Sequence, residues 1–243
     1  MAVKKNEANI EKKKLIENKS MQVLRFLNLG IKNSNIIEQL EIILKIYKYV
    51  VQNIHPEAKY EQNNISNTKE EEYLNNLYIG LTNNPGLSVT NSILFKHLLY
   101  MKGFESYIIL SKSRSGSLHI SNLVKIGKEF FYFDTTLERS IFEEQAINED
   151  DILFCCAALG KEEYSKFYKP FQILPNNLKK SSMQMPENIC EESMPRTLID
   201  SIVKLIPNEI TENNPYFNKC AEEEKINIFC FTSKISQNNK RGK

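Results

Sequence analysis

The sequence has no tryptophan, three histidines and only eight glycines among its 243 residues. The histidines, His55, His97 and His119, are too scattered to give the ligand spacing of a zinc site. The glycines stand singly, so no GxGxxG or GKS/GKT phosphate-binding loop is present. The five cysteines are an odd number without a CxxC pair, which indicates reduced thiols rather than disulfides or a metal site. We therefore predict neither a metal nor a cofactor.

The sequence also lacks an excess of charge and a long apolar run. Its 32 basic and 30 acidic residues leave a formal charge of +2, without the strongly basic face that nucleic-acid binding requires. No stretch approaches the roughly 18–20 apolar residues that span a bilayer. The first residues, MAVKKNEANIEKKK, lack the apolar segment of a secretory signal. We predict a cytoplasmic globular protein that binds neither nucleic acid nor a membrane.

Apolar residues recur at helical spacing in the first half of the chain. The pattern predicts helices over 9–29, 34–54, 70–81 and 87–103, with Ser34 as the N-cap of the second and Gly103 as the stop of the fourth. The fourth helix is the most apolar and is expected to be buried. His97 is predicted to lie on its polar face, in contact with solvent.

The residues after this helix are typical of strands. The segments 107–110, 119–126 and 129–135 are β-branched or aromatic, and Gly127 and Lys128 form a two-residue turn between the last two. Further on, we predict a helix over 150–159 that contains Cys155 and Cys156, an irregular linker over 175–195, a helix over 198–205 and a strand over 226–231. Helices followed by an antiparallel sheet predict an α+β fold, with the central buried helix packed on the sheet.

The same pattern divides the chain into three parts. We expect an N-terminal helical extension (1–33), a core (34–140) and a C-terminal extension or small subdomain of unknown role (141–243). Within the core, Ser88 opens the buried helix, His119 opens a strand and Asp134 ends the strand that pairs with it. A helix start offers free N–H groups, and a hairpin brings its far ends together, as a nucleophile, a base and an orienting carboxylate require. Each has a plain alternative: Ser88 as an N-cap, Asp134 as the cap of the next turn, and His119 as a structural or solvated side chain.

The segments GLSVTNSILFKHLLYMKGF (86–104) and HISNLVKIGKEFFYFDTT (119–136) resemble the core signature of transglutaminase-like proteins, which belong to the papain superfamily. The positions that fit this signature are Gly86, Gly103, His119, Asn122, Val124, Asp134 and Thr136. The resemblance covers roughly residues 35–140. It implies cysteine-nucleophile chemistry on acyl groups, with the family's Cys, His and Asp roles falling on Ser88, His119 and Asp134. Asn91 and Asn122 would line the cleft.

Two positions depart from the family pattern. A serine, Ser88, stands where the family has its cysteine, and a hydroxyl is a far weaker nucleophile than a thiol. Ser121 stands where the family commonly has an aromatic residue, two places after the histidine. Three interpretations follow: a pseudoenzyme whose cleft binds a peptide or protein partner, an active acyl hydrolase or peptidase with a Ser88-His119-Asp134 triad, or a cysteine enzyme whose cysteine was replaced by serine.

Overall fold

The structure is a computed structural model that describes residues 2–30, 35–54, 69–82, 88–144, 153–174 and 184–206. The side chains of residues 2–8, 69–70, 88 and 142–144 lie outside the described part. So do Ser34, Cys220, Cys230 and the strand predicted over 226–231.

Four helices make up the first half of the chain: α1 (Ala2–Phe26), α2 (Ile36–Asn53), α3 (Lys69–Leu81) and α4 (Ser88–Met101). The four predicted helices are therefore confirmed. The predicted N-cap of α2 is wrong by one residue, because Asn35 accepts the hydrogen bond from the backbone N–H of Ile37 with its side chain. Asparagine caps a helix as well as serine does. Gly103 ends α4 as predicted, with a left-handed φ of 80° that favours glycine.

The sheet contains β1 (Ser106–Ser113), β2 (Leu118–Ile126), β3 (Glu129–Phe133) and β4 (Tyr168–Leu174). All neighbouring strands are antiparallel, in the order β3-β2-β1-β4. The predicted hairpin turn is confirmed, and Gly127 in it has a φ of 62°. The predicted α+β class is confirmed, although β4 was not predicted as a strand.

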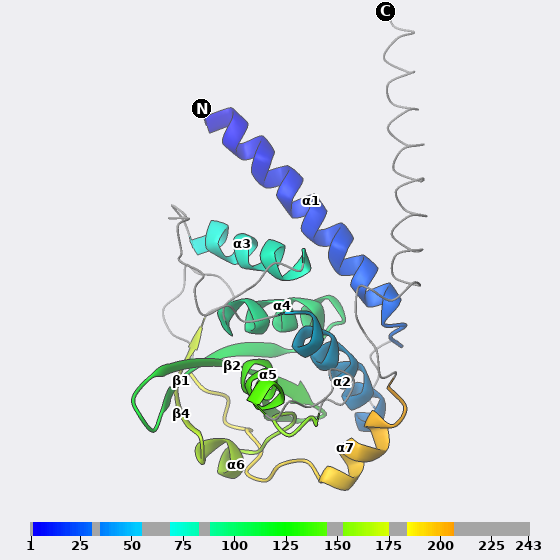
Figure 1. Ribbon diagram of the computed structural model, residues 1–243, viewed down its shortest axis with the longest axis vertical. Coiled ribbons are helices and arrows are strands. Elements are labelled where there is room, and N and C mark those ends of the chain that lie inside the picture. The colour runs from blue at the N-terminus through cyan, green and yellow to red at the C-terminus, as the bar shows by residue number, and fades with distance from the viewer. Residues whose placement is uncertain are drawn as a thin grey trace, which may run out of the picture.

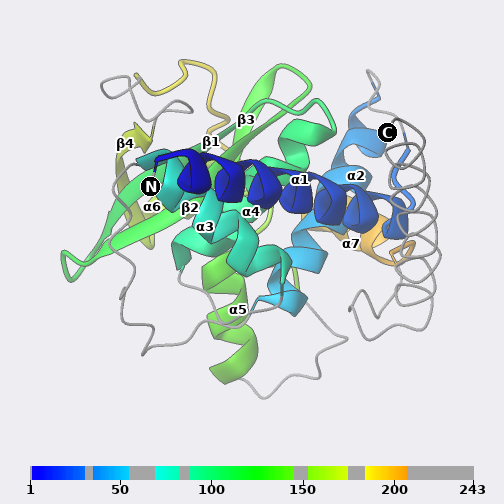
Figure 2. The same ribbon diagram turned by 90° about the horizontal axis from the view of Figure 1, so that it is seen from above.

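Helices cover one face of the sheet in layers. α2 and α4 pack directly on the sheet, and the main core lies between these helices and the sheet. Tyr47, Phe95 and Phe133 are fully buried at the centre of this core. α3 packs on α4, and α1 packs on α3 and crosses above both in the two views (Figures 1 and 2). The prediction that His97 is solvated is wrong, because α1 covers it and Ser20 of α1 lies 3.0 Å from its Nε2 atom. Within the described residues, no helix is long and apolar enough to cross a membrane.

The chain beyond β3 wraps around the sheet. α5 (Thr135–Glu144) packs on α2 and α4, the short α6 (Lys161–Ser165) precedes β4, and α7 (Arg196–Val203) confirms the helix predicted over 198–205. The outer edge of β3 is covered by two irregular segments, since Tyr132 pairs with Leu159 and Phe130 with Ile189. Covering an edge strand in this way prevents pairing with another chain.

The helix predicted over 150–159 is wrong for the residues that the structure describes. Cys155 and Cys156 lie in a turn, between Phe154 and Ala158, which have φ values of 52° and 55°. A right-handed helix is excluded at such values. The backbone N–H groups of the two cysteines donate to the Glu138 carboxylate instead of to a helical carbonyl.

Candidate active site

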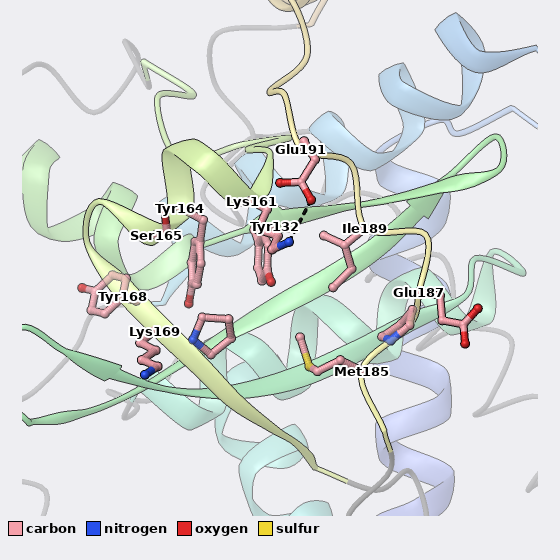
Figure 3. Close-up of a pocket in the computed structure, with 12 residues that line it drawn as sticks. Tyr132, Lys161, Tyr164, Ser165, Tyr168, Lys169, Met185, Glu187, Ile189 and Glu191 are labelled. Atoms are coloured by element: carbon pink, nitrogen blue, oxygen red, sulfur yellow. Dashed lines mark hydrogen bonds and ion pairs between the residues drawn. The ribbon is translucent and has the colours of Figure 1, made fainter.

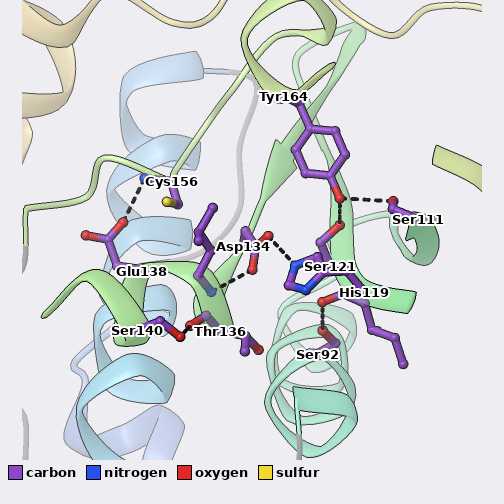
Figure 4. A network of polar contacts seen from close by, with 12 residues as sticks. Ser92, Ser111, His119, Ser121, Asp134, Thr136, Glu138, Ser140, Cys156 and Tyr164 are labelled. Atoms are coloured by element: carbon purple, nitrogen blue, oxygen red, sulfur yellow. Dashed lines mark hydrogen bonds and ion pairs between the residues drawn. The ribbon is translucent and has the colours of Figure 1, made fainter. Parts of the chain in front are cut away.

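Neighbouring strands bring His119 and Asp134 into contact. Asp134 directly follows β3, whose last residue, Phe133, is opposite Asn122 of β2, so the end of β3 meets the start of β2. The His119 Nε2 atom lies 2.5 Å from Asp134 Oδ2, and the carboxylate is buried (Figure 4). A carboxylate only accepts, so Nε2 carries the shared proton and the neutral imidazole has its lone pair on Nδ1. Nδ1 is therefore the nitrogen that can act as a base.

Asp134 is held from four sides. Its second oxygen, Oδ1, accepts from the backbone N–H of Leu137 at 2.9 Å and caps α5. Its own N–H donates to the Cys156 carbonyl at 3.0 Å, and its carbonyl accepts from the Tyr47 hydroxyl at 3.0 Å. The two predicted roles of Asp134, partner of His119 and cap of the next turn, are thus both observed.

An aromatic side chain from β4 supports the imidazole. The ring of Tyr168 stacks on His119 with centroids 4.0 Å apart and planes 7° from parallel. Burial raises the pKa of Tyr168 to about 12, and the nearby Asp134 charge acts in the same direction, so its hydroxyl stays neutral. The alternation of exposed and less exposed residues in YKPFQIL (168–174) is the signal that could have identified β4 from the sequence. Nothing in this segment identifies His119 as the residue on which Tyr168 stacks.

Ser121, two places after His119, contacts a buried tyrosine. Its hydroxyl lies 2.7 Å from the Tyr164 hydroxyl, which also lies 3.0 Å from Ser111 (Figure 4). Tyr164 belongs to α6 and is buried, and this burial raises its pKa. Aromatic rings from α6 and β4 therefore lie beside Ser121 and His119.

The start of α4 lies at the same end of the sheet as the His119–Asp134 pair. Asn122 donates to the Ser92 carbonyl at 3.0 Å, and α4 runs from there towards Ser106, which is opposite Val124. Ser88 is four residues before Ser92, about 6 Å along the helix axis on the side away from Ser106.

The contact between the predicted nucleophile and base remains a prediction, because the Ser88 side chain lies outside the described part of the chain. Side chains alternate along β2, so His119 leaves the strand on the side opposite Asn122 and α4. The side chains of Ser88 and His119 could therefore meet only past the end of β2, not across its face.

The two predicted binding residues are completely buried. Asn122 ties β2 to α4 through its bond to Ser92, and this position is structural. Among the described residues, neither side-chain polar atom of Asn91, in the first turn of α4, has a hydrogen-bond partner. Substrate contact by either asparagine stays a prediction.

A pocket of about 590 Å³ opens beside the histidine (Figure 3). Tyr168 lines it and separates it from His119, and the stacked rings of Tyr132 and Tyr164 form its floor. Lys161 and Glu191 form an ion pair at 2.8 Å on its border. Its volume and aromatic lining are those of a small-molecule or side-chain pocket.

Comparisons with known proteins give weak similarities only. No protein-family model matches the sequence, and no curated protein matches it either. A solved structure of a proposed cysteine protease from Cytophaga hutchinsonii is similar at a TM-score of 0.37 and 13% identity, over 50% of this chain and 37% of that one. The structure of an arylamine N-acetyltransferase from Bacillus cereus with a Cys-His-Glu triad is similar at a TM-score of 0.38 and 13% identity, over 83% of this chain and 79% of that one. Similarities of this size carry no information on chemistry, which has to be inferred from the residues of this chain.

Proposed function

We propose that the protein is an acyl hydrolase in which Ser88 is the nucleophile, His119 the general base and Asp134 the residue that orients the imidazole. The 2.5 Å contact between His119 and a buried, doubly engaged carboxylate supports this proposal most strongly. An imidazole held in one tautomer, with Nδ1 available, is what a base needs in order to activate a hydroxyl.

In this mechanism Ser88 Oγ attacks the carbonyl carbon of an ester or amide, and its proton passes to Nδ1 of His119. The oxyanion accepts hydrogen bonds from N–H groups in the first turn of α4, which have no partner within the helix. The imidazolium then gives its proton to the leaving group, and an acyl-enzyme forms. Water hydrolyses the acyl-enzyme in the reverse sequence of proton transfers, which restores the hydroxyl.

The pocket beside Tyr168 suggests the substrate class. Three tyrosine rings line it, together with Met185 and Ile189, so it suits an apolar or aromatic group, and charged side chains of both signs, such as Lys169 and Glu187, line the rest. We propose an extended peptide or acyl chain whose apolar side group enters this pocket while its carbonyl lies at the end of β2.

A second candidate function is binding without catalysis. Two observations favour it: position 88 carries a hydroxyl in place of the family's thiol, and His119 leaves β2 on the side opposite α4. In this case the same pocket holds a peptide or protein partner, and the pair serves only to stabilise the sheet end.

A fluorophosphonate probe separates the two functions. The hydrolase predicts an adduct on Ser88, located by peptide mass spectrometry, that disappears in Ser88→Ala and in His119→Asn. A matched control, Ser201→Ala, removes an exposed hydroxyl on α7 and leaves labelling unchanged. A folded protein that gives no adduct refutes the hydrolase and favours the binding function.

The third interpretation, an altered cysteine enzyme, is tested with Ser88→Cys. If His119 activates a thiol at this position, alkylation by iodoacetamide is faster in Ser88→Cys than in Ser88→Cys/His119→Asn. Equal rates in the two variants mean that position 88 and His119 do not interact.

A further inference from the structure

Three metal-ligating side chains meet behind Asp134. Glu138 extends from the first turn of α5, and Cys155 and Cys156 lie in the turn that covers it (Figure 4 shows Glu138 and Cys156). One ligand atom from each of the three lies within 4.8 Å of the other two. Glu138 and Cys156 are buried, whereas Cys155 is half-buried and gives access from solvent.

The separations between these atoms are those of a tetrahedral zinc site. The two Sγ atoms are 3.8 Å apart, and Cys155 Sγ is 3.6 Å from Glu138 Oε2. Zinc–sulfur bonds of about 2.3 Å and a zinc–oxygen bond of about 2.1 Å at tetrahedral angles put two sulfurs about 3.8 Å apart and a sulfur and an oxygen about 3.6 Å apart. The side chains therefore need little movement to bind an ion.

We propose that Glu138, Cys155 and Cys156 bind one Zn²⁺ ion, with a water molecule in the fourth position. Each bound ion displaces the protons of both thiols, so that two protons are released and two thiolate–zinc bonds form. Thiolate ligands select a soft or borderline ion over Mg²⁺ or Ca²⁺.

The contacts around Glu138 hold the ligands in place before an ion binds. Its carboxylate accepts from the backbone N–H groups of Cys155 at 3.3 Å and of Cys156 at 2.7 Å, and from the Tyr47 hydroxyl at 3.1 Å. Oε2 accepts from Cys156 and Tyr47, and Oε1 accepts from Cys155. The Tyr47 hydroxyl has a single proton, which it shares with the Asp134 carbonyl, and when the carbonyl takes this proton Oε2 keeps a lone pair that can coordinate the ion. Outer contacts of this kind orient metal ligands and raise affinity.

An ion at this position acts on the backbone of Asp134. The Cys156 carbonyl accepts from the Asp134 N–H, and Tyr47 bonds to both Glu138 and the Asp134 carbonyl. Zinc would fix this turn and so stabilise the end of β3, whether or not the protein is an enzyme. The sequence predicted no metal site, because Glu138 is 17 residues from Cys155 and adjacent cysteines are not a recognised zinc spacing.

The test uses a full-length variant in which Cys190, Cys220 and Cys230 are replaced by serine, so that the adjacent pair provides the only thiols. The protein is reduced and titrated with Zn²⁺ against a chromophoric chelator, and with Co²⁺, whose thiolate charge-transfer absorption reports sulfur ligation. We expect one equivalent of tightly bound ion, a cobalt–thiolate band and a rise in the thermal midpoint. Ca²⁺ serves as a negative control.

Each ligand is then removed in this background. Cys155→Ser and Cys156→Ser are expected to weaken zinc binding by at least about 100-fold, and Glu138→Gln by at least about 10-fold. Cys155 is the decisive position, because its half-exposed side chain tolerates serine and the variant folds. If the reduced protein shows no thiolate band, or if Cys155→Ser binds zinc with unchanged affinity, the site does not exist.

Discussion

His97 makes the packing of α1 sensitive to acid. The Ser20 hydroxyl donates to the Ile16 carbonyl at 2.7 Å, so its only proton is engaged there. The ring of His97 must then donate from Nε2 to Ser20 Oγ across 3.0 Å, which defines the neutral Nε2–H tautomer. Protonation would add a charge at Nδ1 inside the packed helices, and burial accordingly lowers the pKa of His97 from 6.5 to about 4.

The magnitude follows from this pKa difference. One pKa unit corresponds to about 1.4 kcal/mol, so the ionised His97 costs the folded protein about 3 kcal/mol. Above pH 6.5 the histidine is neutral in both states and contributes nothing. As the pH falls from 6.5 to about 4, only the unfolded state takes up the proton, and stability is lost at up to about 1.4 kcal/mol per pH unit. Below pH 4 the loss is complete.

Urea unfolding between pH 7.5 and 4.5, of the wild type and of His97→Gln, measures this effect. Glutamine keeps an N–H donor for Ser20 but does not titrate. The free energy of unfolding of the wild type is expected to fall relative to the variant below pH 6.5, by about 2.5 kcal/mol at pH 4.5. All other titrating groups cancel in the comparison. Parallel curves for the two proteins would refute the buried, neutral histidine.

Three further substitutions test the core, a close backbone contact and the site. Phe95→Ala is expected to cost about 3–5 kcal/mol in chemical unfolding, because the ring is fully buried in the main core, and a loss under about 1 kcal/mol would contradict that packing. Gly160→Ala places a Cβ atom 2.2 Å from the backbone carbon of Glu192, and should lower the free energy of unfolding by more than about 2 kcal/mol; an unchanged midpoint would disprove the contact. Tyr168→Leu removes the ring stacked on the proposed base and should slow fluorophosphonate labelling about tenfold, whereas Tyr168→Phe keeps the ring and the rate; equal rates in the two would exclude a positioning role.

Local patterns were sufficient for the elements that depend on near neighbours. The periodicity of α2 and α4, the stop at Gly103 and the turn at Gly127 all express residue preferences within a few positions of each other. The same locality brought His119 and Asp134 together, because a hairpin of fixed turn determines which residues are opposite.

Apart from the N-cap of α2, which was wrong by one residue, the failures involve partners distant in sequence. Cys155 and Cys156 do not lie in a helix, because their backbone N–H groups donate to Glu138 and the Cys156 carbonyl accepts from Asp134 at the end of β3. His97 looked polar on its own helix, yet α1, more than seventy residues earlier, covers it. Tyr168 supports the imidazole from a strand that no signal placed beside it. Tertiary contacts override local preference in each case.

The hydrogen bonds of Asp134 affect how related sequences are to be interpreted. Its backbone bonds to the cysteine turn and to Tyr47 would persist with any residue at this position, whereas its carboxylate caps α5. Selection for folding alone can therefore preserve this aspartate in a lineage that has lost any chemistry. The side chain of His119, in contrast, contacts Asp134 and Tyr168 at the site and caps no helix. In related sequences, a changed residue at position 119 beside an unchanged Asp134 would indicate that the proposed catalysis has been lost. Unchanged residues at both position 88 and position 119 would indicate that it has been retained.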